Sequence, residues 1–159
     1  MISEPDEEAP MPDAPILICY DGSDEAQHAI DVAADLLSAR KAVVLDVGAV
    51  LTQAESYAAL GPVVPGEAFE DLNLQDASQR AAAGVAQAKA AGFNAEARAE
   101  LDAPTWEGIV DVADEIDAAV IVIGSRGLSG ARSVLEGSVS RDVAEHAGRP
   151  VLVVPPAKR

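Results

Sequence analysis

The sequence of 159 residues has a single cysteine, Cys19, and few aromatic side chains, which make up 3% of the total. One thiol cannot form an internal disulfide, and this cysteine usage is typical of a reducing cytoplasm. With so few aromatic residues, a core must be built from Ala, Val, Leu and Ile. No apolar run reaches the roughly 20 residues that a membrane-spanning helix needs. We therefore expect a cytoplasmic protein with an aliphatic core and no membrane span.

Basic residues are also scarce. The sequence has 11 Lys and Arg against 27 Asp and Glu, so its formal net charge is −16. A negatively charged surface repels the phosphates of nucleic acids and the headgroups of anionic membranes. We therefore expect neither nucleic acid nor a membrane as a partner.

The first 13 residues differ in composition from the rest. They contain five acidic residues, three prolines and no basic residue. Such a segment cannot bury enough apolar surface to offset the entropy of ordering, and it lacks the basic start and apolar run of a signal peptide. We predict a disordered acidic leader over residues 1–13 and a single domain over residues 14–159. A domain of that length buries roughly 68–70% of its unfolded surface.

Beyond the leader, short apolar runs alternate with segments of helical periodicity. The apolar runs predict five strands, at residues 16–20, 42–47, 94–99, 118–123 and 151–154. The periodic segments predict four helices, at residues 23–37, 69–90, 105–115 and 138–147. Because the strands are mostly continuous apolar runs, the pattern is typical of an α/β fold with a parallel sheet covered by helices on both faces. Residues 52–66, with two prolines and two glycines, are expected to form a long loop that acts as a lid or wall.

A glycine-spaced loop lies between the fourth strand and the last helix. Gly124, Gly127 and Gly137 permit positive φ angles and let backbone N–H groups approach a ligand without hindrance from a Cβ atom. A helix that begins at Ser138 points unpaired N–H groups and about half a positive charge toward the same space. The segment therefore predicts a phosphate cradle. The same glycines also suit a plain strand-to-helix turn, and Ser138 an ordinary N-cap.

Three motifs carry a resemblance to a known family. They are the spacing Gly-x2-Gly-x9-Gly-Ser, the run Pro150-Val-Leu-Val-Val, and Tyr20-Asp21-Gly22-Ser23. In these motifs the sequence resembles the universal stress protein family, in particular its ATP-binding branch, over about residues 16–155. The resemblance implies an open, doubly wound parallel sheet of five strands in the order 3-2-1-4-5. In that order the winding reverses between the first and fourth strands, so Asp21 and the Gly124 loop would face each other across a crevice.

The resemblance also implies which residues contact the nucleotide. They are Cys19, Asp21, Val47, Ile123, Gly124, Arg126, Gly127, Gly137 and Ser138. Asp21 would lie beside the adenosine, Cys19 in the wall of the adenine pocket, and the backbone of Val47 against the base. Each has an alternative: Asp21 suits an Asx turn that holds Gly22, and the apolar side chains suit core packing.

Arg126 is the one arginine expected at the ligand. Residues 124–142 contain three arginines and two acidic residues, so this window has a net charge of +1, whereas the whole chain has a net charge of −16. The family accepts several residue types at this position, and exposed arginines are common on protein surfaces. The local charge is therefore the main support for this interpretation.

The sequence has no evident catalytic or metal-binding set. It lacks Gly-x4-Gly-Lys-Ser/Thr, whose lysine reaches the outer phosphates in P-loop enzymes, and no Gly-x-Gly-x-x-Gly follows the first strand. His28 and His146 have no cysteine or second histidine at ligand spacing, and Ser138 lies two helical turns from His146, too far for a hydrogen bond. We expect no catalytic residue and no protein metal site, with surface or capping roles for both histidines.

These observations favour an ATP-binding universal stress protein that acts as a regulatory or sensor module in a stress response. Mg²⁺ should accompany the nucleotide, because ATP brings about four negative charges to an acidic protein. The resemblance implies a homodimer through the last strand, Val151, Leu152, Val153 and Val154.

Two other classes of function remain open at this point. One is a slow ATPase or phosphotransferase, in which Asp21 helps to hold Mg²⁺ and Ser138 meets the terminal phosphate. The other is an interaction protein that has the fold but holds no nucleotide. The intact glycine spacing argues against this last class.

Overall fold

The computed structural model describes residues 13–38, 40–49, 66–102, 104–125 and 138–158. Along these residues the elements run β1 (Ile16–Cys19), α1 (Asp24–Leu36), β2 (Lys41–Ala49), α3 (Gly66–Ala90), β3 (Asn94–Asp102), α4 (Thr105–Glu115), β4 (Val120–Gly124), α5 (Ser138–His146) and β5 (Val151–Val154). Strands and helices alternate, as the sequence predicts.

The five strands form one parallel sheet in the order β3-β2-β1-β4-β5. This finding confirms the expected fold class and strand order. β1 lies at the centre, where Ile16 is in register with Ala42 on one side and with Val120 on the other. Because all strands run the same way, their carboxyl ends lie at one edge of the sheet.

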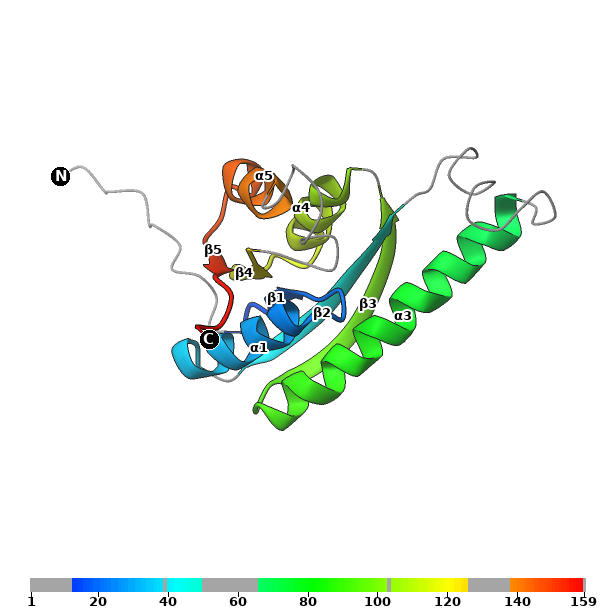
Figure 1. The fold of residues 1–159 in the computed structure, drawn as a ribbon. Coiled ribbons are helices and arrows are strands. Elements are labelled where there is room, and N and C mark those ends of the chain that lie inside the picture. Colours follow the sequence, from blue (N-terminus) through cyan, green and yellow to red (C-terminus); the bar gives the residue numbers. More distant parts are fainter. Residues whose placement is uncertain (1–12, 39, 50–65, 103, 126–137, 159) are drawn as a thin grey trace.

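Two layers of helices cover the sheet, with α1 and α3 on one face and α4 and α5 on the other (Figure 1). Side chains of β1 alternate between these faces. Ile16 and Ile18 belong to the cluster on the α1 and α3 side, and Leu17 belongs to the cluster on the α4 and α5 side. All three are fully buried, and each such side chain stabilises the fold by about 1.5–3 kcal/mol.

The start of α1 follows from its sequence. Ser23 is the N-cap, and its Oγ accepts a hydrogen bond from the N–H of Ala26 at 3.1 Å. This pairing satisfies one of the donors that every helix leaves open at its first turn. The expected apolar stripe faces the sheet, because Ala29, Ile30 and Ala33 are completely buried.

Small residues let α3 lie close to the sheet. Ala77, Ala81, Gly84 and Ala88 repeat at helical spacing along its buried face. A Cβ atom built on Gly84 would lie 2.8 Å from ring carbons of Tyr20 and 2.8 Å from Cγ1 of Val44. The absence of a side chain at Gly84 therefore allows the close approach of α3 to Val44 on β2 and to Tyr20, directly after β1.

β2 and β3 extend further than the apolar runs predict. They stay in register from Lys41 and Asn94 to Ala49 and Asp102, whereas the sequence predicts an end of β3 at residue 99. As the edge strand of the sheet, β3 is only partly covered, so the charges in its second half are tolerated. Similarly, α3 begins at Gly66, three residues before its expected start.

Several expected segments lie outside the described residues, namely the leader up to residue 12 and the expected loop up to residue 65. The single-domain boundary at residue 14 therefore stays a prediction. Among the helices that the structure describes, none combines the length and apolar character required to cross a membrane.

Candidate functional site

The candidate site lies where the winding of the sheet reverses. β1 pairs with β2 on one side and with β4 on the other, with Ile18 in register with Val122. The segments that follow β1 and β4 therefore leave the same edge of the sheet side by side. In open α/β sheets, ligands bind in the crevice at this point. The structure thus brings Asp21 and Gly124 to neighbouring strand ends, as expected from residues about a hundred positions apart.

The turn between β1 and α1 is held by Asp21. Its Oδ1 accepts hydrogen bonds from the N–H of Ser23 at 2.9 Å and from the Ser23 hydroxyl at 2.5 Å. Gly22, between them, has a φ of +82°, a conformation that side chains with a Cβ rarely adopt. The Asx turn considered for Asp21 is therefore present. It fixes the carboxylate at the carboxyl end of β1.

Cys19, Val47 and Ile123 gather on one face of the sheet. Ile123 belongs to the apolar cluster beneath α4 and α5, and Cys19 and Val47 pack against that cluster, partly buried. Burial and the nearby charge of Asp21 raise the pKa of the Cys19 thiol to about 12. The thiol is therefore protonated at neutral pH and has no nucleophilic character. These side chains form an apolar wall at the carboxyl ends of the strands.

The backbone of Val47 lies beyond the end of β1. The C=O of Leu45 accepts a hydrogen bond from the N–H of Tyr20 at 2.8 Å, so Leu45 directs its backbone groups toward β1. Because successive residues of a strand alternate in direction, Val47 directs its N–H and C=O to the same side. The last β1 residue in register with β2 is Cys19, opposite Leu45. The polar groups of Val47 thus face the crevice side of the sheet edge.

The glycine-spaced motif is described only at its two ends. Gly124 closes β4, and the next N–H, that of Ser125, donates to the C=O of Val154 at 2.8 Å. α5 begins at Ser138 as expected, but its side chain is not among those described. Arg126, Gly127 and Gly137 lie outside the described residues. Their expected contacts with phosphate stay predictions.

An ion pair that the sequence did not reveal lies beside the crevice. Nε and Nη2 of Arg80 donate to the two carboxylate oxygens of Asp46 at 2.6 and 3.1 Å. The Asp46 side chain is 3% exposed and that of Arg80 37%. Burial raises the pKa of Asp46, while the hydrogen bonds and charge of Arg80 act against that rise. Asp46 stands out in the sequence as the only charge in the run at 42–47, but its partner lies 34 residues away on α3.

The two histidines are at other places. His146 stacks on Trp106 with ring centroids 4.5 Å apart, and its Nδ1 lies 2.7 Å from the C=O of Asp142. His28 is a half-buried residue of α1. Within the described ranges, no cluster of three or more His, Cys, Asp or Glu side chains is arranged to hold a metal ion.

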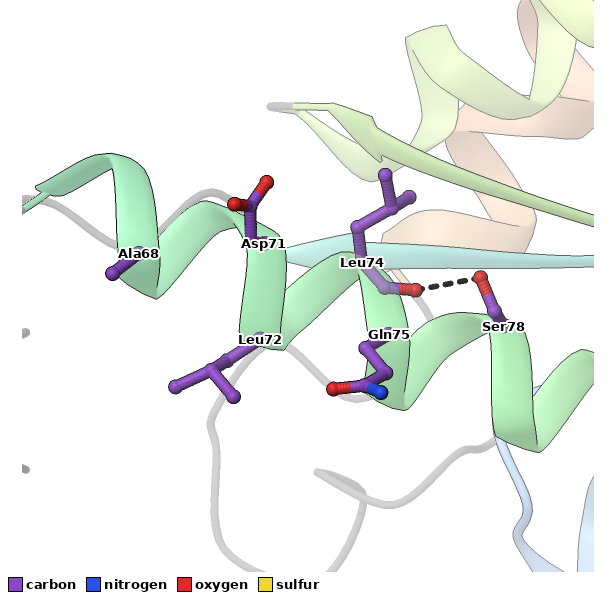
Figure 2. Close-up of a pocket in the computed structure, with 6 residues that line it drawn as sticks. All are labelled: Ala68, Asp71, Leu72, Leu74, Gln75 and Ser78. Atoms are coloured by element: carbon purple, nitrogen blue, oxygen red, sulfur yellow. Dashed lines mark hydrogen bonds between the residues drawn. The ribbon is translucent and has the colours of Figure 1, made fainter.

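A hollow on α3 lies apart from the crevice. The described residues that line it all belong to the first half of that helix: Ala68, Asp71, Leu72, Leu74, Gln75 and Ser78 (Figure 2). Ser78 closes a local hydrogen bond to the C=O of Leu74 at 2.7 Å. Since none of the expected site residues that the structure describes lines this hollow, it does not change the assignment of the site.

Comparisons with known proteins agree with the geometry. The sequence model of the universal stress protein family matches residues 14–155. The universal stress protein YxiE of Bacillus subtilis is 31% identical, over 87% of this chain and 97% of its own length. The solved structure of hypothetical protein MJ0577 superposes with a TM-score of 0.72 at 22% identity, covering 92% of this chain and 99% of that one. A universal stress protein in complex with cAMP is 28% identical, with a TM-score of 0.56, covering 88% of this chain and 95% of that chain.

Proposed function

The chain belongs to the universal stress protein family, and on that premise we propose that it binds ATP with Mg²⁺ in the crevice between β1 and β4. The observation that carries the proposal is the meeting of the Asp21 turn and Gly124 at neighbouring strand ends. The neighbour solved with cAMP supports an adenine nucleotide as the class of ligand. In this proposal the protein is a cytoplasmic regulatory or sensor module in a stress response.

The parts of the crevice suit the parts of a nucleotide. The apolar wall formed by Cys19, Val47 and Ile123 offers a surface for the flat base, and the backbone of Val47 offers a donor and an acceptor beside it. The carboxylate of Asp21 accepts hydrogen bonds and so suits the hydroxyls of a ribose. The start of α5 at Ser138 offers N–H groups and a positive dipole end for phosphate.

We expect slow or no turnover of the bound nucleotide. A phosphoryl-transfer enzyme must position a nucleophile and neutralise the charge that develops on the transferred group. Asp21 already accepts two hydrogen bonds within its own turn, and the Cys19 thiol is protonated at neutral pH. The expected rate of MgATP hydrolysis is therefore far below the roughly 1–100 s⁻¹ of kinases. Phosphate release in that range, lost in Asp21→Ala while ATP still binds, would favour the ATPase or phosphotransferase instead.

The proposal includes a homodimer through β5. In the strand order of the sheet, β5 neighbours β4 alone, so its outer side is an edge. Val153 is 38% exposed there, and Pro155 and Pro156 follow the strand. The opposite edge strand, β3, carries the ion pairs of Arg98 with Glu100 and Glu115. Charges protect an edge from pairing, whereas an apolar edge favours it, and two identical edges can pair across a two-fold axis.

Val153→Lys should therefore lower the mass of the protein in solution toward that of a monomer. The change would place two like charges in the same β5–β5 contact and so oppose pairing. Light scattering over a range of concentrations measures the effect. The matched control is Leu72→Lys, since Leu72 is 50% exposed on α3 and should tolerate the same change without loss of mass. A monomer at all concentrations in the unsubstituted protein, or dissociation by Leu72→Lys alone, would contradict this interface.

A further inference from the structure

The Arg80–Asp46 ion pair touches both backbone segments that the proposed function places around the nucleoside. Asp46 directly precedes Val47 on β2. Gly22, directly after Asp21, lies against the stem of Arg80, because a Cβ atom built on Gly22 would be 3.5 Å from Cδ of Arg80. One side chain from α3 therefore contacts β2 at the residue before Val47 and lies against the turn after β1.

The charges around this pair show why a cation is needed at the position of Arg80. Asp46 is nearly fully buried, so its carboxylate is costly without a cation and hydrogen-bond donors. The negative charge of Asp21 acts on Asp46 and raises its pKa further. Arg80 also interacts favourably with the charge of Asp21, which contributes to raising the pKa of the guanidinium. Arg80 thus interacts with carboxylates on both segments, with Asp46 through two hydrogen bonds and with Asp21 through its charge, and also with the charge of Asp76 on its own helix.

The position of Arg80 is itself fixed by the packing of α3. Gly84 lies one helical turn further on and packs directly against Tyr20 and Val44. Ala77 and Ala81, on the same stretch, are completely buried. Because these residues leave no room for α3 to shift toward the sheet, the helix backbone that carries Arg80 is held close to the strands.

We propose that the Arg80–Asp46 ion pair is a positioning element of the nucleotide site, which sets the spacing between the Asp21 turn and the Val47 backbone and thereby ties α3 to nucleoside binding. The proposal rests on the nucleotide binding proposed above. It adds residues that touch no ligand and act through Asp21 and Val47. Binding of the nucleoside should then depend on the bidentate geometry of Arg80, and not only on its charge.

The test compares the affinities for AMP and ATP, with excess Mg²⁺, by calorimetry on the full chain. Arg80→Met keeps an aliphatic side chain but removes the charge and both hydrogen bonds. It should weaken the binding of AMP and the binding of ATP by the same factor, about ten or more. The factors are equal because both ligands carry the same nucleoside. Arg80→Lys should restore only part of the affinity, because an ammonium group cannot donate in a fork. Arg98→Met is the matched control, since Arg98 is also ion-paired, on β3, away from the crevice.

A pH profile separates positioning from general stability. In Arg80→Met the buried Asp46 loses its cation, so its pKa rises further and it takes up a proton at a higher pH than in the unsubstituted protein. Protonation relieves the repulsion from Asp21, so the affinity of Arg80→Met for AMP should recover as the pH is lowered. The double variant Arg80→Met with Asp46→Asn should bind AMP with little dependence on pH, because the titrating carboxylate is gone.

Each outcome decides between the two proposals. If the unsubstituted protein binds neither AMP nor ATP, the proposed function fails and the positioning role fails with it. If it binds both, but folded Arg80→Met binds within about twofold of it, only the positioning role is overturned. A larger loss of affinity for ATP than for AMP in Arg80→Met would also overturn the positioning role, since Arg80 would then act on the phosphates. Should Arg80→Met fail to fold, Asp46→Asn takes its place, with the same loss for both ligands expected.

Discussion

Gly127→Val and Gly137→Val should each abolish most of the affinity for ATP while leaving the fold nearly as stable as before. A branched side chain at either position stands where backbone N–H groups are expected to approach phosphate, so it blocks contacts that form only in the complex. We expect a weakening of binding by about tenfold to a hundredfold, which corresponds to about 1.4–2.8 kcal/mol. Calorimetry with MgATP measures it, and chemical unfolding of the same samples measures stability.

A glycine far from the crevice provides the control for this experiment. Gly92 has a φ of +104° and open space around the place of a Cβ atom, and it lies in the turn between α3 and β3. Gly92→Val should therefore lower the stability through backbone strain but leave the affinity for ATP unchanged. If Gly127→Val and Gly137→Val both bind ATP like the unsubstituted protein, the glycine-spaced loop is not the phosphate site.

Gly84→Val should have the largest effect on stability. Its first side-chain carbon would lie 2.8 Å from the ring of Tyr20 and from Val44, and the remaining methyl groups add to the overlap. Overpacking of a core costs typically 1–3 kcal/mol, and more where the surroundings cannot move. For a domain of this size, 1 kcal/mol lowers the melting temperature by about 2–4 °C. We therefore expect a decrease of roughly 6 °C or more in a thermal melt.

The neighbouring residue Ala83 is exposed on the same helix and so provides the matched control. Ala83→Val makes a similar change in size but costs only the lower helix propensity of valine, about 0.5 kcal/mol. Equal and small shifts for the two variants would show that α3 does not pack against Tyr20 as described.

Much of the fold could be predicted from local sequence patterns. The continuous apolar runs around Ile18, Val44 and Val122 predict buried parallel strands, and Ser23 before an apolar stripe predicts the start of α1. The strand order was not contained in these patterns. It came from the family resemblance, and the register of β1 with β2 and β4 confirms it.

Where the sequence-based predictions differ from the structure, the cause is a contact between residues that are far apart in the sequence. β3 continues to Asp102 because pairing with β2, and not an apolar run, holds its second half. The Asp46–Arg80 pair was missed because it joins residues 34 positions apart, and sequence periodicity says nothing about which side chains meet between a strand and a helix. By contrast, Asp21 and Gly124 could be placed together, because their positions at strand ends follow from the strand order alone.

The expected nucleotide contacts differ in how far the structure supports them. Cys19, Val47 and Ile123 share one face of the sheet, which a period of two along each strand also predicts. Asp21 serves the Asx turn that the sequence suggested, and this turn leaves its carboxylate at the crevice. The phosphate side of the site depends on residues 126–137, which lie outside the described ranges, so the functional assignment there rests on the glycine spacing.

The most direct test of nucleotide binding is the melting temperature of the purified protein with and without MgATP. A ligand that binds only the folded state, at about a hundred times its Kd, stabilises that state by about 2.7 kcal/mol. For a domain of this size, the melting temperature should then rise by about 5–10 °C. GTP at the same concentration should give a smaller rise if the apolar wall and the Val47 backbone select adenine. No rise with ATP, ADP, AMP or cAMP would contradict the nucleotide site and leave an interaction protein with the universal stress protein fold.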